Sequence, residues 1–193
     1  MLPTLGTPRL AVRPATSADL DDIWRLLTAP DVRRHLRDDV ELPRHQAARM
    51  LDQALAARPS GFGWWLISFR RGDRLGCAGL QPLSSAMAAC ATHLAGDVEP
   101  WIALAPEHWG RGYAFETLAA ILAYGFRARR LERIVALVDE PNAASHRLMG
   151  RLGFASAGSG TQPRYQMTCY ELSPSSFEGR GPDRVGPRAE PSL

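Results

Sequence analysis

Two closely spaced glycines, Gly110 and Gly112, stand between an apolar run and a segment with helical spacing. The segment repeats small and apolar residues at intervals of three and four, as a helix with one buried face does. These residues are Ala114, Leu118, Ile121, Leu122 and Gly125. A helix start has free backbone N–H groups and the positive end of the helix dipole, and glycines let that backbone approach a phosphate. Residues 98–126 are therefore predicted to form a strand, a phosphate loop and a helix.

The same glycines are compatible with an ordinary tight turn between a strand and a helix. Two other kinds of phosphate loop do not fit. The loop lacks the Lys-Ser/Thr ending of a nucleoside-triphosphate site. It also lacks the third glycine and the following acidic residue of a dinucleotide site.

The residues Trp109, Gly112 and Ala114 resemble the pyrophosphate loop of the GNAT superfamily of N-acetyltransferases, whose pattern is Gln/Arg-x-x-Gly-x-Gly/Ala. The first position departs from that pattern. However, Trp-Gly-Arg-Gly-Tyr-Ala followed by an acidic residue is similar to the RimJ/RimL-type branch, which acetylates the N-termini of ribosomal proteins. A second segment is similar to the same branch, namely Asn142-x-x-Ser145-x-x-Leu148-Met149-x-x-Leu152-Gly153-Phe154. The resemblance extends over about residues 7–172.

The resemblance implies that acetyl-CoA is the acyl donor and that its thioester lies where two parallel strands splay apart. Main-chain contacts to the acetyl group and the pantetheine arm would come from Ile102, Ala103 and Leu104, with a backbone N–H bonding the thioester oxygen. The pyrophosphate would be bound by six loop residues. These are Trp109, Gly110, Arg111, Gly112, Tyr113 and Ala114.

Three more positions take roles from the resemblance. Asn142 matches a residue that contacts the cofactor arm, although a helix cap would also explain it. Ser145 matches the proton donor to the departing thiolate, although a serine in a first helical turn can be purely structural. Glu99 is the candidate general base, because the similar branch often carries Glu at the start of this strand. Its alternative is a solvated carboxylate at a strand end.

Three other titratable residues lie near these segments. His108 and His146 have suitable intrinsic pKa values, but the sequence shows no partner for either, so they rank below Glu99. Glu116 is expected to stabilise the start of the helix that follows the loop.

The resemblance thus implies transfer of acetyl from acetyl-CoA to a primary amine, and the branch indicates a protein N-terminus as the acceptor. Two alternatives stay open. One is a small-molecule amine such as an aminoglycoside or a polyamine, and the other is a non-catalytic CoA-binding regulatory module, because a fold does not fix a function. The preferred acyl group and the oligomeric state, monomer or homodimer, are open too.

The composition of the chain narrows the function classes. Its 193 residues suit one domain, and its apolar content of 45% is ordinary for a globular protein. No apolar run approaches the roughly 20 residues that cross a membrane, and no secretory leader is visible, which predicts a cytoplasmic protein. The net charge of +3 is modest and the arginines are interspersed with acids, so nucleic-acid binding is not indicated.

Cysteine and lysine usage adds two exclusions. The three cysteines are widely spaced, which suits reduced thiols, and no spacing typical of a metal site occurs. Every basic residue apart from histidine is an arginine, so no lysine amine can serve as a base.

The first half of the chain reads as a strand, helices and a hairpin. Residues 10–13 are a short strand, and Thr16 or Ser17 can cap a helix. That helix would bury Leu20, Ile23, Trp24 and Leu27. A shorter helical piece is expected at 32–37 and a longer helix from Pro43. Residues 62–69 and 75–83 form a hairpin candidate around 71–73, while 84–96 allows either helix or a longer hairpin.

The second half completes an α/β domain. Residues 133–138 are expected to form a buried strand that pairs with 98–104 through a helical crossover. A helix should open at Pro141-Asn142 and end at Gly153, and 165–172 should form the last strand. With the resemblance, the expected fold is GNAT-like: a mixed, mostly antiparallel sheet with helices on both faces and a splayed parallel strand pair. The expected domain covers residues 1–172, followed by a disordered tail at 173–193.

Overall fold

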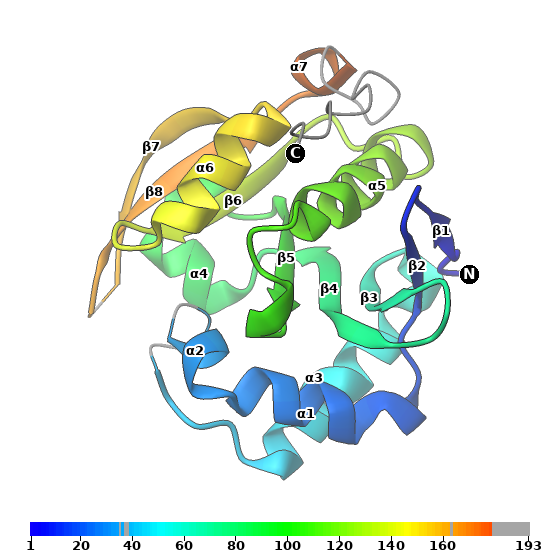
Figure 1. Cartoon of the computed structure of the whole chain (residues 1–193). Helices are drawn as coiled ribbons and strands as arrows, with labels where there is room; N and C mark the ends of the chain where they lie inside the picture. The colour runs from blue at the N-terminus through cyan, green and yellow to red at the C-terminus, as the bar shows by residue number, and fades with distance from the viewer. Residues whose placement is uncertain (35, 37–38, 163, 179–193) are drawn as a thin grey trace, which may run out of the picture.

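The computed structural model describes residues 1–34, 36, 39–162 and 164–178. Its strands form two antiparallel sheets, and helices lie on both faces of the strands (Figure 1). This is the expected α/β architecture. No helix within the described ranges is both long enough and apolar enough to cross a membrane.

The first sheet has five antiparallel strands in the order β1-β2-β3-β4-β5. They are β1 (Leu5–Gly6), β2 (Leu10–Pro14), β3 (Gly63–Phe69), β4 (Arg74–Pro82) and β5 (Val98–Leu104). The predicted hairpin is confirmed as β3 and β4. Gly72 lies in its turn with a φ of 112°, a conformation that favours glycine.

The second sheet has three antiparallel strands in the order β6-β8-β7. They are β6 (Ile134–Asp139), β7 (Ala155–Thr161) and β8 (Gln166–Leu172). The expectation that residues 133–138 pair with 98–104 is wrong, because the ladder of β6 is made with β8. Strands β5 and β6 are in contact, but no backbone ladder joins them. The gap between the two sheets is thus the expected splay.

Two long helices cover one face of the sheets, α5 (Tyr113–Arg127) and α6 (Ala143–Leu152) (Figure 1). The predicted apolar face of α5 is confirmed, since Leu118, Ile121 and Leu122 are buried in the main core cluster. The predicted end of α6 is also confirmed. Gly153 follows the helix in the left-handed conformation, with a φ of 95°.

A short C-terminal helix, α7 (Pro174–Glu178), packs on the same side. Its Phe177 is 2% exposed, and its ring centroid lies 5.5 Å from that of Phe126 in α5. The expectation that disorder begins at Ser173 is therefore wrong for α7, because one aromatic side chain anchors this turn in the core. The rest of the expected tail, 179–193, lies outside the described residues.

The opposite face of the first sheet carries the N-terminal helices (Figure 1). They are α1 (Leu20–Thr28), α2 (Pro30–Arg33) and α3 (Arg44–Ala56). They enclose a second core cluster with Trp64, Leu66 and Cys77 of β3 and β4. The helical piece expected at 32–37 is displaced, because α2 begins at Pro30 and ends at Arg33; residues 35, 37 and 38 lie outside the described part.

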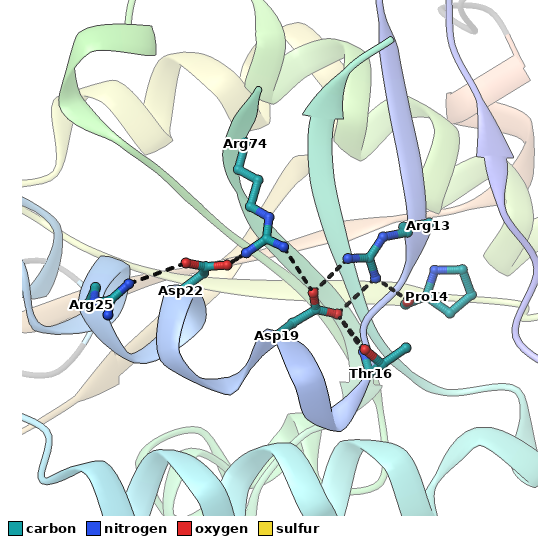
Figure 2. Close-up of polar contacts among 7 residues, drawn as sticks. All are labelled: Arg13, Pro14, Thr16, Asp19, Asp22, Arg25 and Arg74. Carbon is teal, nitrogen blue, oxygen red and sulfur yellow. Dashed lines mark hydrogen bonds and ion pairs between the residues drawn. The ribbon is translucent and has the colours of Figure 1, made fainter. Parts of the chain in front are cut away.

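A buried carboxylate fastens the start of α1 to the sheet, as Figure 2 shows. Asp19 is 1% exposed and accepts hydrogen bonds from Arg13 at 2.8 and 2.6 Å and from the N–H of Thr16 at 2.7 Å. Burial opposes its ionisation, but these bonds hold the pKa of Asp19 down at about 2. Beside it, Arg74 of β4 pairs with Asp22 of α1.

Residues 84–96, which the sequence left undecided, contain α4 (Ser85–Cys90) and a 3₁₀ turn, Thr92–Leu94. Leu94 packs against Val135 of β6 and Cys169 of β8. The segment therefore covers the face of the second sheet that α6 leaves open.

Candidate active site

The predicted phosphate loop lies between β5 and α5. Gly110 and Gly112 have φ values of 72° and 80°, where a side chain would be strained. Gly112 occupies the cap position of α5, and within the described ranges no side chain caps this helix start. The first N–H groups of α5 therefore lack a side-chain acceptor, and with the helix dipole they favour an anion.

The other loop residues surround this helix start. Arg111 is exposed, whereas Tyr113 and Ala114 pack against the main core cluster. Trp109 is 48% exposed, and its indole Nε1–H donates to the carbonyl of Leu104 at 2.7 Å. That bond ties the first loop residue to the last residue of β5, so it fixes how the loop leaves the strand.

A brace from the N-terminal hairpin holds the loop from the other side. Glu116, in the first turn of α5, accepts bonds from the N–H of Arg9 at 2.8 Å, from its Nε at 2.6 Å and from the hydroxyl of Thr7 at 2.7 Å. Burial opposes ionisation of Glu116, yet these bonds keep its pKa below the ordinary value. Arg9 also donates to the carbonyl of Arg111 at 3.1 Å, and its guanidinium lies 4.5 Å from the ring centroid of Tyr113.

Sequence reasoning assigned Glu116 to the helix start but missed Thr7 and Arg9. They are separated from Glu116 by more than a hundred residues, and no local pattern connects them. Only the fold of the chain brings this brace together.

Strand β5 pairs with β4 on one side and, in the part of the chain that the structure describes, has no backbone ladder on the other, which is its open edge. Its register with β4 determines which residues present backbone groups at this edge. On the β4 side, Ala105 donates to the carbonyl of Leu75 at 2.8 Å and Leu83 donates to that of Asp97 at 2.7 Å. Because backbone groups of an antiparallel strand alternate between its two neighbours, the odd-numbered residues 97–105 bond to β4 and the even-numbered ones point away. Pro100, which has no N–H, falls at an outward position, as this register requires.

The open edge therefore carries two N–H groups next to the loop, those of Ile102 and Leu104. The carbonyl of Leu104 is already taken by Trp109. Ala103 was expected to contribute as well, but it pairs with Cys77 of β4 and its amide belongs to that ladder. Of these three residues, Ile102 and Leu104 are the ones whose backbone N–H groups point away from β4 and can donate to a bound carbonyl.

Asn142 and Ser145 meet at the start of α6. The side-chain oxygen of Asn142 accepts a bond from the N–H of Ser145 at 3.1 Å, so Asn142 is a helix cap, which was one of its two interpretations. The hydroxyl of Ser145 has no hydrogen-bond partner among the described residues, and Ser145 as a whole residue is partly exposed. It is therefore accessible for chemistry.

His146 has the partners that the sequence did not reveal. Its Nε2 lies 3.1 Å from the carbonyl of Asp139 and its Nδ1 lies 2.8 Å from the hydroxyl of Tyr170. A carbonyl can only accept, so Nε2 carries a proton, and in the neutral ring Nδ1 accepts from Tyr170. Both nitrogens are engaged, which leaves His146 a structural link between α6, β6 and β8.

His108 lies in the 3₁₀ turn Pro106–His108 that precedes the loop. Its ring packs edge-on against Phe69 and Tyr113, with centroid distances of 5.7 and 6.4 Å. Its Nδ1 is buried and finds no hydrogen-bond partner in the described part of the chain. The ring thus serves as packing beneath the loop.

Glu99 lies at the start of β5 on the face covered by α1 and α3. Side chains alternate along a strand, and Trp101 and Ala103 belong to the cluster on that face. Gln81, the partner of Glu99 across the ladder, donates to its Oε1 at 3.4 Å. Burial raises the pKa of Glu99 above its ordinary value, and the bond from Gln81 opposes that rise. A carboxylate with a raised pKa is a better base near neutral pH.

The two catalytic candidates lie on opposite sides of the strands. Ser145 belongs to α6, which packs on the same face as α5, whereas Glu99 faces α1 and α3. No hydrogen bond links the two within the described ranges. A group held in the splay between β5 and β6 could be approached by one residue from each side.

A cavity of about 350 Å³ opens on the Glu99 side of the sheet, between α1, β4 and the segment after β5. Its floor is apolar, with Ile23, Leu66 and Cys77, and its rim is charged, with Arg74 and Glu107. Burial raises the pKa of the Cys77 thiol, so this cysteine is not a nucleophile.

Comparison with known proteins identifies the family of the chain. The family model for the acetyltransferase (GNAT) domain matches residues 9–155. The relative described as uncharacterized N-acetyltransferase YoaA, from Bacillus subtilis, is 30% identical over 168 residues, which cover 86% of this chain and 90% of YoaA. A solved GNAT-family acetyltransferase from Bordetella pertussis has a TM-score of 0.75 at 26% identity and covers 89% of this chain and 99% of its own.

Two solved structures with coenzyme A share the fold at lower identity. RimL, an alpha-N-protein acetyltransferase for a ribosomal protein, has a TM-score of 0.70 at 16% identity, covering 89% of this chain and 97% of RimL. The aminoglycoside acetyltransferase AAC(6')-Ib has a TM-score of 0.73 at 14% identity, covering 88% and 98%. Because the family model spans most of the chain and YoaA matches nearly its whole length, the chain belongs to the GNAT family and is an acetyltransferase.

Proposed function

We propose that this protein transfers acetyl from acetyl-CoA to a primary amine and that its acceptor is a protein N-terminus. The observation that carries the transfer is the open edge of β5 beside the uncapped start of α5. The helix start suits a pyrophosphate and the strand edge offers N–H donors to a thioester oxygen. One extended ligand with both groups, such as acetyl-CoA, fits this pair of features.

In this mechanism the loop residues 109–114 bind the pyrophosphate, and Asn142 keeps α6 in place beside the cofactor arm. The N–H of Ile102 donates to the thioester oxygen as it gains charge. Glu99 takes a proton from the attacking amine, directly or through water. The C–S bond breaks as the C–N bond forms, and Ser145 gives its hydroxyl proton to the departing sulfur and regains one from solvent.

Two observations support a protein N-terminus as the acceptor. The loop reads Trp-Gly-Arg-Gly-Tyr-Ala with Glu116 behind it, and Asn142 and Ser145 recur at the spacing of the RimJ/RimL-type branch. RimL itself shares the fold. The similar TM-score of AAC(6')-Ib supports a second candidate, a small-molecule amine.

The test is a CoA-release assay with acetyl-CoA and a panel of N-terminal peptides, polyamines and aminoglycosides. We expect peptides to be acetylated at the α-amine, as fragment mass spectra would reveal. Faster transfer to an aminoglycoside or a polyamine would reject the N-terminal acceptor. Tight CoA binding without transfer to any member of the panel would favour a regulatory module instead.

The residue roles are tested in the same assay. Ser145→Ala should lower turnover by roughly 10²–10⁴-fold, the cost of a lost general acid, with little change in the Kd for acetyl-CoA. Glu99→Gln should remove the acidic limb of the pH–rate profile. The comparison needs two acceptors of different pKa, because a limb that moves with the acceptor belongs to the amine and not to Glu99.

A further inference from the structure

Two tryptophans meet on the face of the sheet that carries Glu99. Trp64 of β3 and Trp101 of β5 lie edge to face, with ring centroids 4.8 Å apart. They meet across Gly79 of β4, which pairs with both residues in the ladders. A Cβ on Gly79 would collide with the indole of Trp101, so the glycine makes room for this contact. The indole of Trp64 is thereby held in a defined position.

Gln81 connects this indole to Glu99. The Nε1–H of Trp64 donates to Gln81 Oε1 at 3.2 Å, and Gln81 Nε2 donates to Glu99 Oε1 at 3.4 Å. An indole nitrogen can only donate, so the carbonyl end of the Gln81 amide must face Trp64. The NH₂ end then points to Glu99, where an ionised carboxylate can only accept. The indole N–H of Trp64 therefore determines how the Gln81 amide is turned and the direction of both hydrogen bonds.

Several charged side chains of the surrounding elements pair with one another. Among these pairs are Arg13 with Asp19, Arg74 with Asp22, Arg44 with Asp21, and Arg133 with both Asp97 and Glu171. The ionisation of Glu99 is instead governed by burial, which disfavours it, and by the bond from Gln81, which favours it.

We propose that Gln81, oriented by Trp64, is a positioning residue that holds the Glu99 carboxylate ionised and in a fixed orientation for the acceptor amine. The inference rests on the proposed function, in which Glu99 is the base. It adds two residues, Gln81 and Trp64, that act on the base from neighbouring strands.

The test uses variants that remove one donor each. Gln81→Met keeps an unbranched side chain but loses the amide, and Trp64→Phe keeps an aromatic ring but loses the indole N–H. The matched control is Trp65→Phe. Trp65 is the next residue on β3, faces the opposite side and donates to the carbonyl of Pro3 at 2.8 Å. Its variant loses a similar bond away from Glu99.

We expect the acidic limb of kcat/KM to move to higher pH in Gln81→Met, by about half a pH unit to one unit, because a long hydrogen bond to a charged group is at the weak end of its range. Trp64→Phe should move the limb in the same direction by less, since the amide remains but can turn. Trp65→Phe should leave the limb where it is. An unmoved limb in Gln81→Met overturns the proposal, and so does an equal shift in Trp65→Phe.

A second readout does not depend on activity. The carboxyl carbon signal of Glu99, assigned by its loss in Glu99→Gln, can be titrated by ¹³C NMR in each variant. We expect the pKa of Glu99 to rise in Gln81→Met, and an unchanged titration overturns the positioning role. If this pKa rises while Glu99→Gln keeps full turnover, the link from Gln81 to Glu99 stands and the base assignment is what fails.

Discussion

Replacing Ile102 with proline tests which backbone group stabilises the thioester oxygen. In the register of β5, the N–H of Ile102 points away from β4, so proline at this position breaks no ladder bond. The same strand already carries a proline at the equivalent outward position, Pro100. The residue before a proline favours extended backbone, which Trp101 already has. The variant should therefore fold and lack one donor.

The expected loss of turnover follows from the groups that the substitution removes. One oxyanion donor is worth about 10²–10³-fold in kcat, or about 2.7–4 kcal/mol. The partly buried side chain of Ile102 is lost too, so Ile102→Ala is the matched control that shortens the side chain but keeps the N–H. Relative to Ile102→Ala, Ile102→Pro should lose at least about 10²-fold in turnover.

The assay is single-turnover acetyl transfer, with thermal unfolding measured on each variant. Ala103→Pro serves as the contrasting change, because it removes a donor that belongs to the ladder with β4, and it should lower Tm much more than Ile102→Pro. Equal turnover in Ile102→Pro and Ile102→Ala would refute the reasoning. A larger Tm loss at position 102 than at 103 would show that the register is misread.

Three further changes test the loop, the buried carboxylate and the C-terminal helix. Gly112→Asp should abolish acetyl-CoA binding, because it strains the left-handed position and adds an anion where a phosphate is expected. An unchanged affinity for acetyl-CoA in calorimetry would reject the assignment of the loop to phosphate binding. Asp19 has its pKa lowered to about 2, so it stabilises the fold above pH 4 or so and loses this effect as the pH falls toward 2. Asp19→Asn should therefore cost about 2 kcal/mol in urea unfolding at pH 7 and progressively less in acid; a loss independent of pH would contradict the assigned charge. Phe177→Ala should lower the free energy of unfolding by about 3 kcal/mol, since the ring is fully buried; Tm unchanged from wild type would mean that α7 does not dock.

The sequence predicts those features of the protein whose backbone conformation depends on residues close together in the chain. The glycines at 110 and 112, the apolar spacing of α5 and the closing Gly153 each determine backbone conformation within a few residues. These features were predicted correctly. Residues 109–114 lie in the loop and at the start of α5, and Asn142 and Ser145 lie at the start of α6, as expected.

Long-range partners are different, because the sequence carries no local signal for them. The ladder of β6 with β8, and not with β5, depends on which edges the whole fold leaves open. The single aromatic residue Phe177 in a polar segment gives no periodic pattern, yet it anchors α7. The brace of Arg9 on Glu116 and the link of Gln81 to Glu99 appear only once the register is known.

The most direct test of the central claim is an NMR titration of the ¹⁵N-labelled protein with acetyl-CoA. We expect the largest amide shifts at Ile102 and Leu104 on the open edge of β5 and at residues 110–114 at the start of α5. These signals should move together and saturate at one equivalent. Shifts centred on the cavity between α1 and β4, or no saturable shifts at all, would contradict the site described for acetyl transfer.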